Sequence, residues 1–197
     1  MKYLKLFENF DSYDPYELMI VPPNKKAEMI IVESGKDNPN LDLVKDLITL
    51  GANLDWQDES DGNNPLLSYI VRFKNTRILK ILLESGANPN LQNDSGRSAL
   101  HYTSATNLFR ASKILLEYNA NPNILNMMKK TPLHFAAYFN NLMVVQLLLE
   151  SGADPNLKDI NGKTPLDLVA KAPWNSIYLN KTYRPEGTIE ILKEYMK

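Results

Sequence analysis

Two short motifs recur with the same period along most of this chain. The first reads Gly-Ala-Asn-Pro-Asn in its second copy, and its copies begin at Gly51, Gly86, Asn119 and Gly152. The second reads Thr-Pro-Leu-His in its third copy, and its copies begin at Asn64, Ser98, Thr131 and Thr164. Successive copies lie 33 to 35 residues apart. A fixed period of this length predicts stacked supersecondary units rather than one globular core.

Residues 126–157 show what one unit contains. Thr131 suits a helix N-cap, and Pro132 suits the first helical position, where a missing N–H costs nothing. Apolar residues then return at helical spacing over 142–149. Gly152 fits the left-handed residue after a helix, and Pro155 prevents continuation. The unit is therefore predicted to be helix, turn, helix and a turn-rich extension.

The amino-acid composition excludes several kinds of site and partner. The chain has no cysteine, which excludes disulfides, thiolate zinc sites and a cysteine nucleophile. The formal net charge of −1, without a basic block, argues against nucleic acid as a partner. No apolar run is long enough to span a bilayer, and the lysine-containing start does not read as a secretory signal. We expect a cytoplasmic protein, in the host cytoplasm if its source is a virus.

The repeated residues resemble the ankyrin repeat. The closest match is Thr131-Pro132-Leu133-His134 followed by the ending Leu148 to Asn156. The resemblance implies an all-α solenoid of stacked helix-turn-helix units with β-hairpin-like connecting loops. It covers residues 24–197, with 1–23 as an N-terminal extension whose short helix packs on the first repeat. The expected repeats are 24–57, 58–92, 93–125, 126–158 and 159–197.

Several copies depart from the family pattern. Asn119 replaces a helix-ending glycine, and since Asn tolerates the left-handed conformation the turn can survive. Lys129 replaces the turn glycine of the fourth repeat, which puts the usual hairpin geometry there in doubt. Residues 35–39 lengthen the inter-helix turn of the first repeat, and 171–187 are an insertion in the last. A polar final helix, 188–197, is expected to cap the stack.

The family resemblance also implies a protein-binding concave face made of hairpin tips and first helices. Mapped onto this chain, its variable positions give the predicted partner-binding residues: Trp56, Asp94, Arg97, Met127, Met128, Lys130, Tyr138, Phe139, Ile160 and Lys163.

The fourth repeat stands out among these positions. Met127, Met128, Tyr138 and Phe139 are apolar or aromatic where solubility favours polar groups, which suits adaptable contacts and anchors. Arg97 and the adjacent Lys130 would supply charge selectivity. The alternative is that Met128 and Phe139 only pack against adjacent hairpins.

Two tryptophan segments leave alternatives open. Trp56, beside acidic residues, either clamps a basic segment or covers the first seam between repeats. The insertion, with Trp174 and Tyr178, either folds back over the last repeat or presents these rings to a ligand. Folding back is favoured, because so many exposed aromatic groups would invite aggregation.

Catalysis is not indicated. His101 and His134 occupy the same position of adjacent repeats, and the family resemblance implies that this histidine holds the hairpin backbone. No phosphate loop, serine elbow or zinc-binding His-Glu-x-x-His motif is present. No enzyme activity, cofactor or metal is expected.

The sequence thus predicts a monomeric, non-enzymatic adaptor or scaffold for a protein partner, with no nucleic acid or membrane. The alternative is a viral or bacterial effector that neutralises a host factor, including by capture of a small ligand beneath the Trp174 loop.

Overall fold

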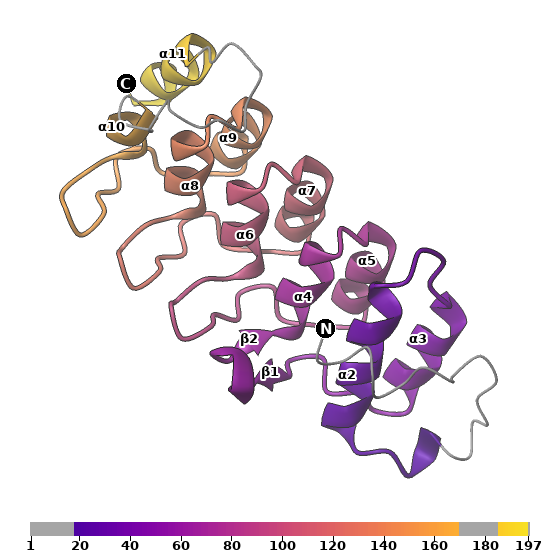
Figure 1. The fold of residues 1–197 in the computed structure, drawn as a ribbon. Helices are drawn as coiled ribbons and strands as arrows, with labels where there is room; N and C mark the ends of the chain where they lie inside the picture. The colour runs from indigo at the N-terminus through magenta and orange to yellow at the C-terminus, as the bar shows by residue number, and fades with distance from the viewer. Residues whose placement is uncertain (1–17, 170–184, 197) are drawn as a thin grey trace.

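The computed structural model describes residues 18–169 and 185–196, and its helices stack in antiparallel pairs along one direction (Figure 1). The first helices of the pairs are α2 (Pro23–Ser34), α4 (Leu66–Arg72), α6 (Ala99–Ala105), α8 (Pro132–Tyr138) and α10 (Pro165–Val169). The second helices are α3 (Leu41–Thr49), α5 (Thr76–Glu84), α7 (Phe109–Glu117), α9 (Leu142–Glu150) and α11 (Glu186–Tyr195). This arrangement confirms the predicted all-α solenoid.

The helices begin where the sequence places capping residues. At α8, the Thr131 hydroxyl accepts from the His134 backbone N–H, and the His134 ring accepts from the Thr131 N–H at 3.1 Å. These reciprocal bonds satisfy two donors that a helix start leaves unpaired. Ser98 and His101 make a capping box at the start of α6.

The predicted helix ends are also confirmed. Gly152 follows α9 with φ of 86°, and Asn119 takes the same left-handed region at 63° after α7. The long first inter-helix turn is present, because α2 ends at Ser34 and α3 begins only at Leu41. α11 begins at Glu186, two residues before the predicted final helix.

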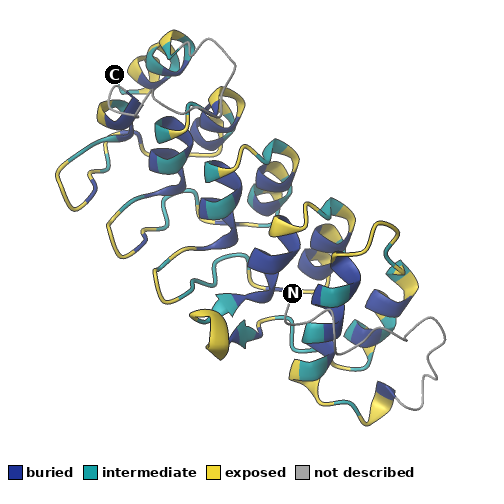
Figure 2. Cartoon of the chain, in the orientation of Figure 1, coloured by how far each residue is buried: buried dark blue, intermediate teal, exposed yellow. Residues whose placement is uncertain are grey.

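The hydrophobic core runs along the stack between the first and second helices (Figure 2). Each middle repeat contributes a leucine that is fully enclosed, as Leu82, Leu115 and Leu148 show at the same repeat position. Burial of one such side chain contributes about 1.5–3 kcal/mol. Since neither helix of a pair could enclose its leucine alone, stability depends on neighbouring repeats.

Hairpin loops project from the side of the stack that carries the first helices (Figure 1). The first of them contains the short antiparallel strands β1 (Gln57–Asp58) and β2 (Asn64–Pro65), joined through the 3-10 turn η1 (Glu59–Asp61). We call the surface formed by the hairpin loops and the first helices the hairpin face.

Asparagines of the repeated motif connect successive repeats. The Asn123 side-chain oxygen accepts from the Asp154 N–H at 2.7 Å, while its amide donates to the Gly152 carbonyl at 2.9 Å. Asn90 makes the equivalent pair of bonds with Asn121 and Asn119, one repeat earlier. The motif therefore supplies inter-repeat hydrogen bonds in addition to a helix stop.

The ends of the stack are covered differently. Leu18, just before α2, is buried against the first repeat. Residues 1–17 of the predicted N-terminal extension and 171–184 of the predicted insertion, together with residue 170, lie outside the described residues. At the other end, α11 packs on α9, and the Thr188 hydroxyl donates to the Asn140 side-chain oxygen at 2.6 Å.

Candidate functional site

One Asn or Asp side chain holds each of the three later hairpins. The Asn126 side-chain oxygen accepts from the N–H groups of Met128 and Lys130, both at 2.9 Å. Asn93 does the same one repeat earlier, and Asp159 one repeat later. Sequence reasoning missed this role, although the 33-residue spacing of Asn93, Asn126 and Asp159 carried the signal.

Backbone hydrogen bonds also connect neighbouring hairpin tips. The N–H of Met127 donates to the Ser95 carbonyl at 3.1 Å, and the N–H of Ile160 donates to the Met128 carbonyl at 2.9 Å. Asp94 donates in the same way to Gly62 at 2.9 Å. The tips are thus fixed relative to one another, so a ligand that contacts several of them meets a preformed surface.

Lys129 does not disrupt the hairpin of the fourth repeat. It takes the left-handed conformation expected of the missing glycine, with φ of 54°, and its N–H donates to the Asn126 carbonyl at 2.9 Å. The doubt raised by the sequence is thereby resolved in favour of the usual geometry. Because a non-glycine residue in this region is strained, the neighbouring tip contacts must stabilise it.

Both histidines connect a first helix to the next hairpin. The Nε2–H of His101 donates to the Lys130 carbonyl at 3.0 Å, and its Nδ1 accepts from the Ser98 N–H at 3.1 Å. His134 repeats this arrangement with the Lys163 carbonyl and the Thr131 N–H. These bonds confirm the structural role predicted for both rings and leave no ring nitrogen available for catalysis.

This bonding pattern requires neutral imidazoles. Burial lowers the pKa of His101 to about 4, although the hydrogen bond to the Lys130 carbonyl acts in the opposite direction. Burial also lowers the pKa of His134. Protonation would place an N–H on Nδ1, directly facing the backbone N–H that this atom accepts from.

The predicted tip residues form a continuous exposed apolar surface. Met127 is 70% exposed, Ile160 is 55% exposed and Met128 is 48% exposed, and backbone bonds bring the last two side by side. We call these three residues the apolar patch. Lys130 lies half-buried beside it, with its Nζ 4.0 Å from the buried Asp159 carboxylate.

Tyr138 and Phe139 lie apart from the apolar patch. Their rings meet edge to face at 5.0 Å where α8 ends, and Phe139 is exposed. α8 begins at Pro132, immediately after the hairpin, so its seven residues put about 10 Å between the two groups. The predicted anchors therefore form two sets at opposite ends of one helix.

The remaining charged positions flank the apolar patch. Arg97 and Asp94 are exposed, and Lys163 is half-buried. Asp94 accepts from the Asn63 amide of the preceding hairpin at 2.8 Å. Arg97 extends over the ring of Phe135 on α8, with its guanidinium carbon 5.3 Å from the ring centroid.

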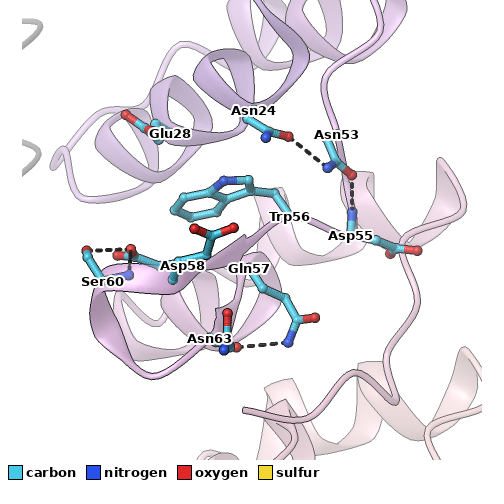
Figure 3. Close-up of a pocket in the computed structure, with 10 residues that line it drawn as sticks. Asn24, Glu28, Asn53, Asp55, Trp56, Gln57, Asp58, Ser60 and Asn63 are labelled. Carbon is cyan, nitrogen blue, oxygen red and sulfur yellow. Dashed lines mark hydrogen bonds between the residues drawn. The ribbon is translucent and has the colours of Figure 1, made fainter. Parts of the chain in front are cut away.

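Trp56 is buried rather than presented to solvent. Its side chain is 9% exposed, and its ring lies tilted against Tyr69 at 6.5 Å. This placement favours the interpretation of Trp56 as the cover of the first seam over its interpretation as a clamp. One edge of the indole borders a polar hollow of about 550 Å³, together with Asn24, Glu28 and Asp55 (Figure 3).

Tyr69 contacts Asp58, one of the residues that line this hollow. Its hydroxyl hydrogen-bonds Asp61 at 2.7 Å and Asp58 at 3.0 Å. Burial raises the pKa of the Tyr69 hydroxyl, and the two carboxylates raise it further. Tyr69 therefore stays a neutral donor that holds this hairpin in place.

The described ranges 18–169 and 185–196 carry no sign of a metal site or a membrane span. No cluster of three His, Cys, Asp or Glu side chains there has a metal-binding arrangement. No helix in these ranges has the length and apolar character needed to cross a membrane. Trp174 and Tyr178, for which ligand contact was one alternative, lie outside them.

Comparison with known families agrees with this architecture. The profile described as ankyrin repeats matches three overlapping segments, 29–126, 67–159 and 110–175. These segments cover well over half of the chain, so the chain belongs to the ankyrin repeat family.

A viral relative matches part of the chain. An ankyrin repeat protein of Acanthamoeba polyphaga mimivirus is 37% identical over 83 residues. The match spans 41% of this chain and about half, 51%, of that protein. The chain is therefore a solenoid of the ankyrin repeat family, whose repeats generally mediate protein–protein interaction, and it is similar over part of its length to a giant-virus repeat protein.

Proposed function

We propose that this chain is a non-enzymatic adaptor that holds a protein partner on its hairpin face. The observation that carries the proposal is the apolar patch of Met127, Met128 and Ile160, whose backbone is fixed by inter-tip hydrogen bonds. Scattered exposed apolar residues are normal on proteins, but a contiguous set on a rigid support is typical of an interaction site. Methionines adapt their shape to a partner at little cost.

A second set of anchors extends the surface along α8. The Tyr138 and Phe139 rings are packed against each other, so contact with a partner costs them little side-chain entropy. A partner that covers both sets must follow α8 from its hairpin to its last turn. Asp94, Arg97, Lys130 and Lys163 would then select the partner's charge.

Nothing in this arrangement favours catalysis. The ring nitrogens of both histidines are hydrogen-bonded to backbone groups. The acidic side chains beside Trp56 line an open, mostly polar hollow. We accordingly propose a cytosolic, monomeric chain that acts without a cofactor and without nucleic acid.

The test is a comparison of variants on a partner purified and reconstituted with the chain. The partner is first captured from the native cytoplasm and then measured by titration calorimetry. Replacement of Tyr138 and Phe139 by alanine should weaken binding by more than about tenfold, as loss of aromatic anchors does. Met127→Ser should weaken it less.

The matched control is Met143→Ser. Met143 is 56% exposed on α9, away from the hairpin face, so its replacement should leave affinity unchanged. Equal affinity of the Tyr138/Phe139 double variant and the unaltered chain would contradict the proposed site. A loss with Met143→Ser would instead move the site to the second helices.

A second candidate function is neutralisation of a host factor. The similarity to a mimivirus repeat protein favours it, and it would use the same hairpin face. Host proteins would then be captured in preference to proteins encoded with the chain itself. Capture of the latter alone would exclude this candidate.

A further inference from the structure

Aromatic side chains occupy one position of three successive first helices. Tyr69 lies on α4, Tyr102 on α6 and Phe135 on α8, at intervals of 33 residues. Tyr69 is buried, while Tyr102 and Phe135 are half-buried and so keep part of their rings at the hairpin face. We call these three residues the aromatic row.

Two arginines cover this row. The guanidinium carbon of Arg72 lies 5.7 Å from the Tyr69 ring centroid and 5.8 Å from that of Tyr102. Arg97 lies 5.3 Å from the Phe135 ring, whose position is also held by an edge contact with His101 at 5.6 Å. Both arginines are thus held on the face of an aromatic ring, and both are exposed.

The two guanidinium groups differ in their own partners. Arg72 approaches the Asp61 carboxylate at 3.9 Å, a long and exposed ion pair that contributes little. Within the described part of the chain, no carboxylate lies within the 4.0 Å ion-pair distance of Arg97. A guanidinium stacked on a ring keeps its in-plane N–H donors free, and those donors match a carboxylate in two-bond geometry.

Arg97 lies between the two sets of apolar anchors. It comes from the hairpin that precedes α6, and its guanidinium reaches across to the ring of Phe135 in the middle of α8. The apolar patch lies before α8, and Tyr138 and Phe139 end that helix. A chain that crosses the face along α8 therefore meets apolar, cationic and apolar groups in turn.

We propose that the hairpin face binds an extended, acidic protein segment, whose carboxylates pair with Arg97 and Arg72 and whose apolar side chains flank them. The proposal rests on the proposed function and adds the chemistry of the partner. Charge complementarity supports it, since Lys130 and Lys163 occupy the position of Arg97 in the next two repeats. The preformed contacts of the arginines with the rings, at 5.3–5.8 Å from the ring centroids, reduce the entropy lost when they bind.

A nucleic acid fits this face less well. Asp61 is close to Arg72, and Asp94 lies on the same hairpin as Arg97, so the cations are interrupted by acidic groups. A continuous phosphate backbone would be repelled at those points, whereas separated carboxylates on a peptide can avoid them. The net charge of −1 agrees with this preference.

The test is a selection of short random peptides displayed on a surface and panned against the full chain. Selected peptides should be enriched in Asp and Glu with apolar residues on both sides. The Arg72→Gln/Arg97→Gln variant should lose this enrichment. Arg110→Gln, an exposed arginine on the second helix α7, is the matched control and should keep it.

A fluorescein-labelled copy of the best peptide then gives affinities by anisotropy. Arg97→Gln should weaken binding by about tenfold, as loss of a charge-assisted pair does. Arg97→Lys should recover only part, because it restores charge without the fork or the stack. Circular dichroism and thermal unfolding confirm that each variant is folded.

Three results would overturn the proposal. The first is that the peptides selected by panning lack acidic residues. The second is that acidic peptides bind the Arg72→Gln/Arg97→Gln variant as well as the unaltered chain. The third is that an oligouridylate probe binds more tightly than any peptide. Neutral peptides that bind the chain and are lost with Tyr138→Ala would reject the acidic partner while retaining the proposed function. Acidic peptides whose binding is unchanged by Tyr138→Ala but lost with Arg97→Gln would support the acidic partner while contradicting the anchor role of Tyr138 in the proposed function.

Discussion

Mild acid should destabilise this protein through its two histidines. His101 is neutral in the folded state, where burial lowers its pKa to about 4 from the ordinary 6.5. As the pH falls below 6.5, the unfolded chain binds the proton first, so the folded state loses stability until the pH reaches the folded pKa. The stabilisation by neutral His101 is fully present above the ordinary pKa of 6.5.

The size of the effect follows from the shift. Since one pKa unit corresponds to about 1.4 kcal/mol, His101 alone should lower the free energy of unfolding by about 2 kcal/mol between about pH 8 and about pH 5. His134 adds to this in the same direction.

Chemical unfolding followed by circular dichroism at a series of pH values measures this slope. His101→Gln should be less stable than the unaltered chain at about pH 8, because glutamine has no acceptor at the position of Nδ1 and leaves the buried Ser98 N–H without its partner at a cost of about 1–3 kcal/mol. The free energy of unfolding of this variant should fall clearly less steeply as the pH is lowered. The His101→Gln/His134→Gln variant should be nearly flat.

The reasoning fails if the double variant keeps the slope of the unaltered chain. Acid sensitivity would then come from other groups, and the neutral imidazoles would not be required for folding. If the free energy of unfolding of the unaltered chain increased as the pH is lowered, the direction of the pKa shift itself would be contradicted.

Three further predictions concern stability. Lys129→Gly should raise the free energy of unfolding by about 1 kcal/mol, because it removes a non-glycine side chain from the left-handed conformation. Gly96→Ala should lower the free energy of unfolding, and by more than Gly162→Ala does. The added Cβ at Gly96 would lie 2.8 Å from the Met127 nitrogen, but at Gly162 it would meet nothing within 4 Å; equal losses in thermal unfolding would refute this. Asn123→Ala should cost about 1–2 kcal/mol by breaking its two inter-repeat bonds, and an unchanged urea midpoint would show that these bonds are dispensable.

Much of the fold was accessible from local sequence signals. Thr131 with Pro132 fixed a helix start, and Asn119 marked a helix end, because caps and left-handed turns depend on only a few adjacent residues. The role of His101 was also predicted, through family resemblance. By contrast, the sequence left the turn at Lys129 in doubt, and only its observed φ of 54° and its bond to the Asn126 carbonyl removed that doubt.

The candidate site was predicted less completely. Met127 and Ile160 proved exposed, but Trp56, for which a clamp was one alternative, is buried against Tyr69. The aromatic row was missed, although Tyr69, Tyr102 and Phe135 recur at the repeat period. Periodic apolar residues on a helix usually indicate core, so the sequence offered no reason to place part of the Tyr102 and Phe135 rings at a surface.

The sequence by itself determined the unit, its period and the family, because these depend on caps, turns and spacing within about 33 residues. Tertiary structure decided which side chains meet between repeats. Arg97 reaches Phe135, and the His101 ring reaches the Lys130 carbonyl, across gaps that no local propensity defines. Stacking sets those distances, and it is stacking that gathers the apolar patch, the arginines and the rings on one face.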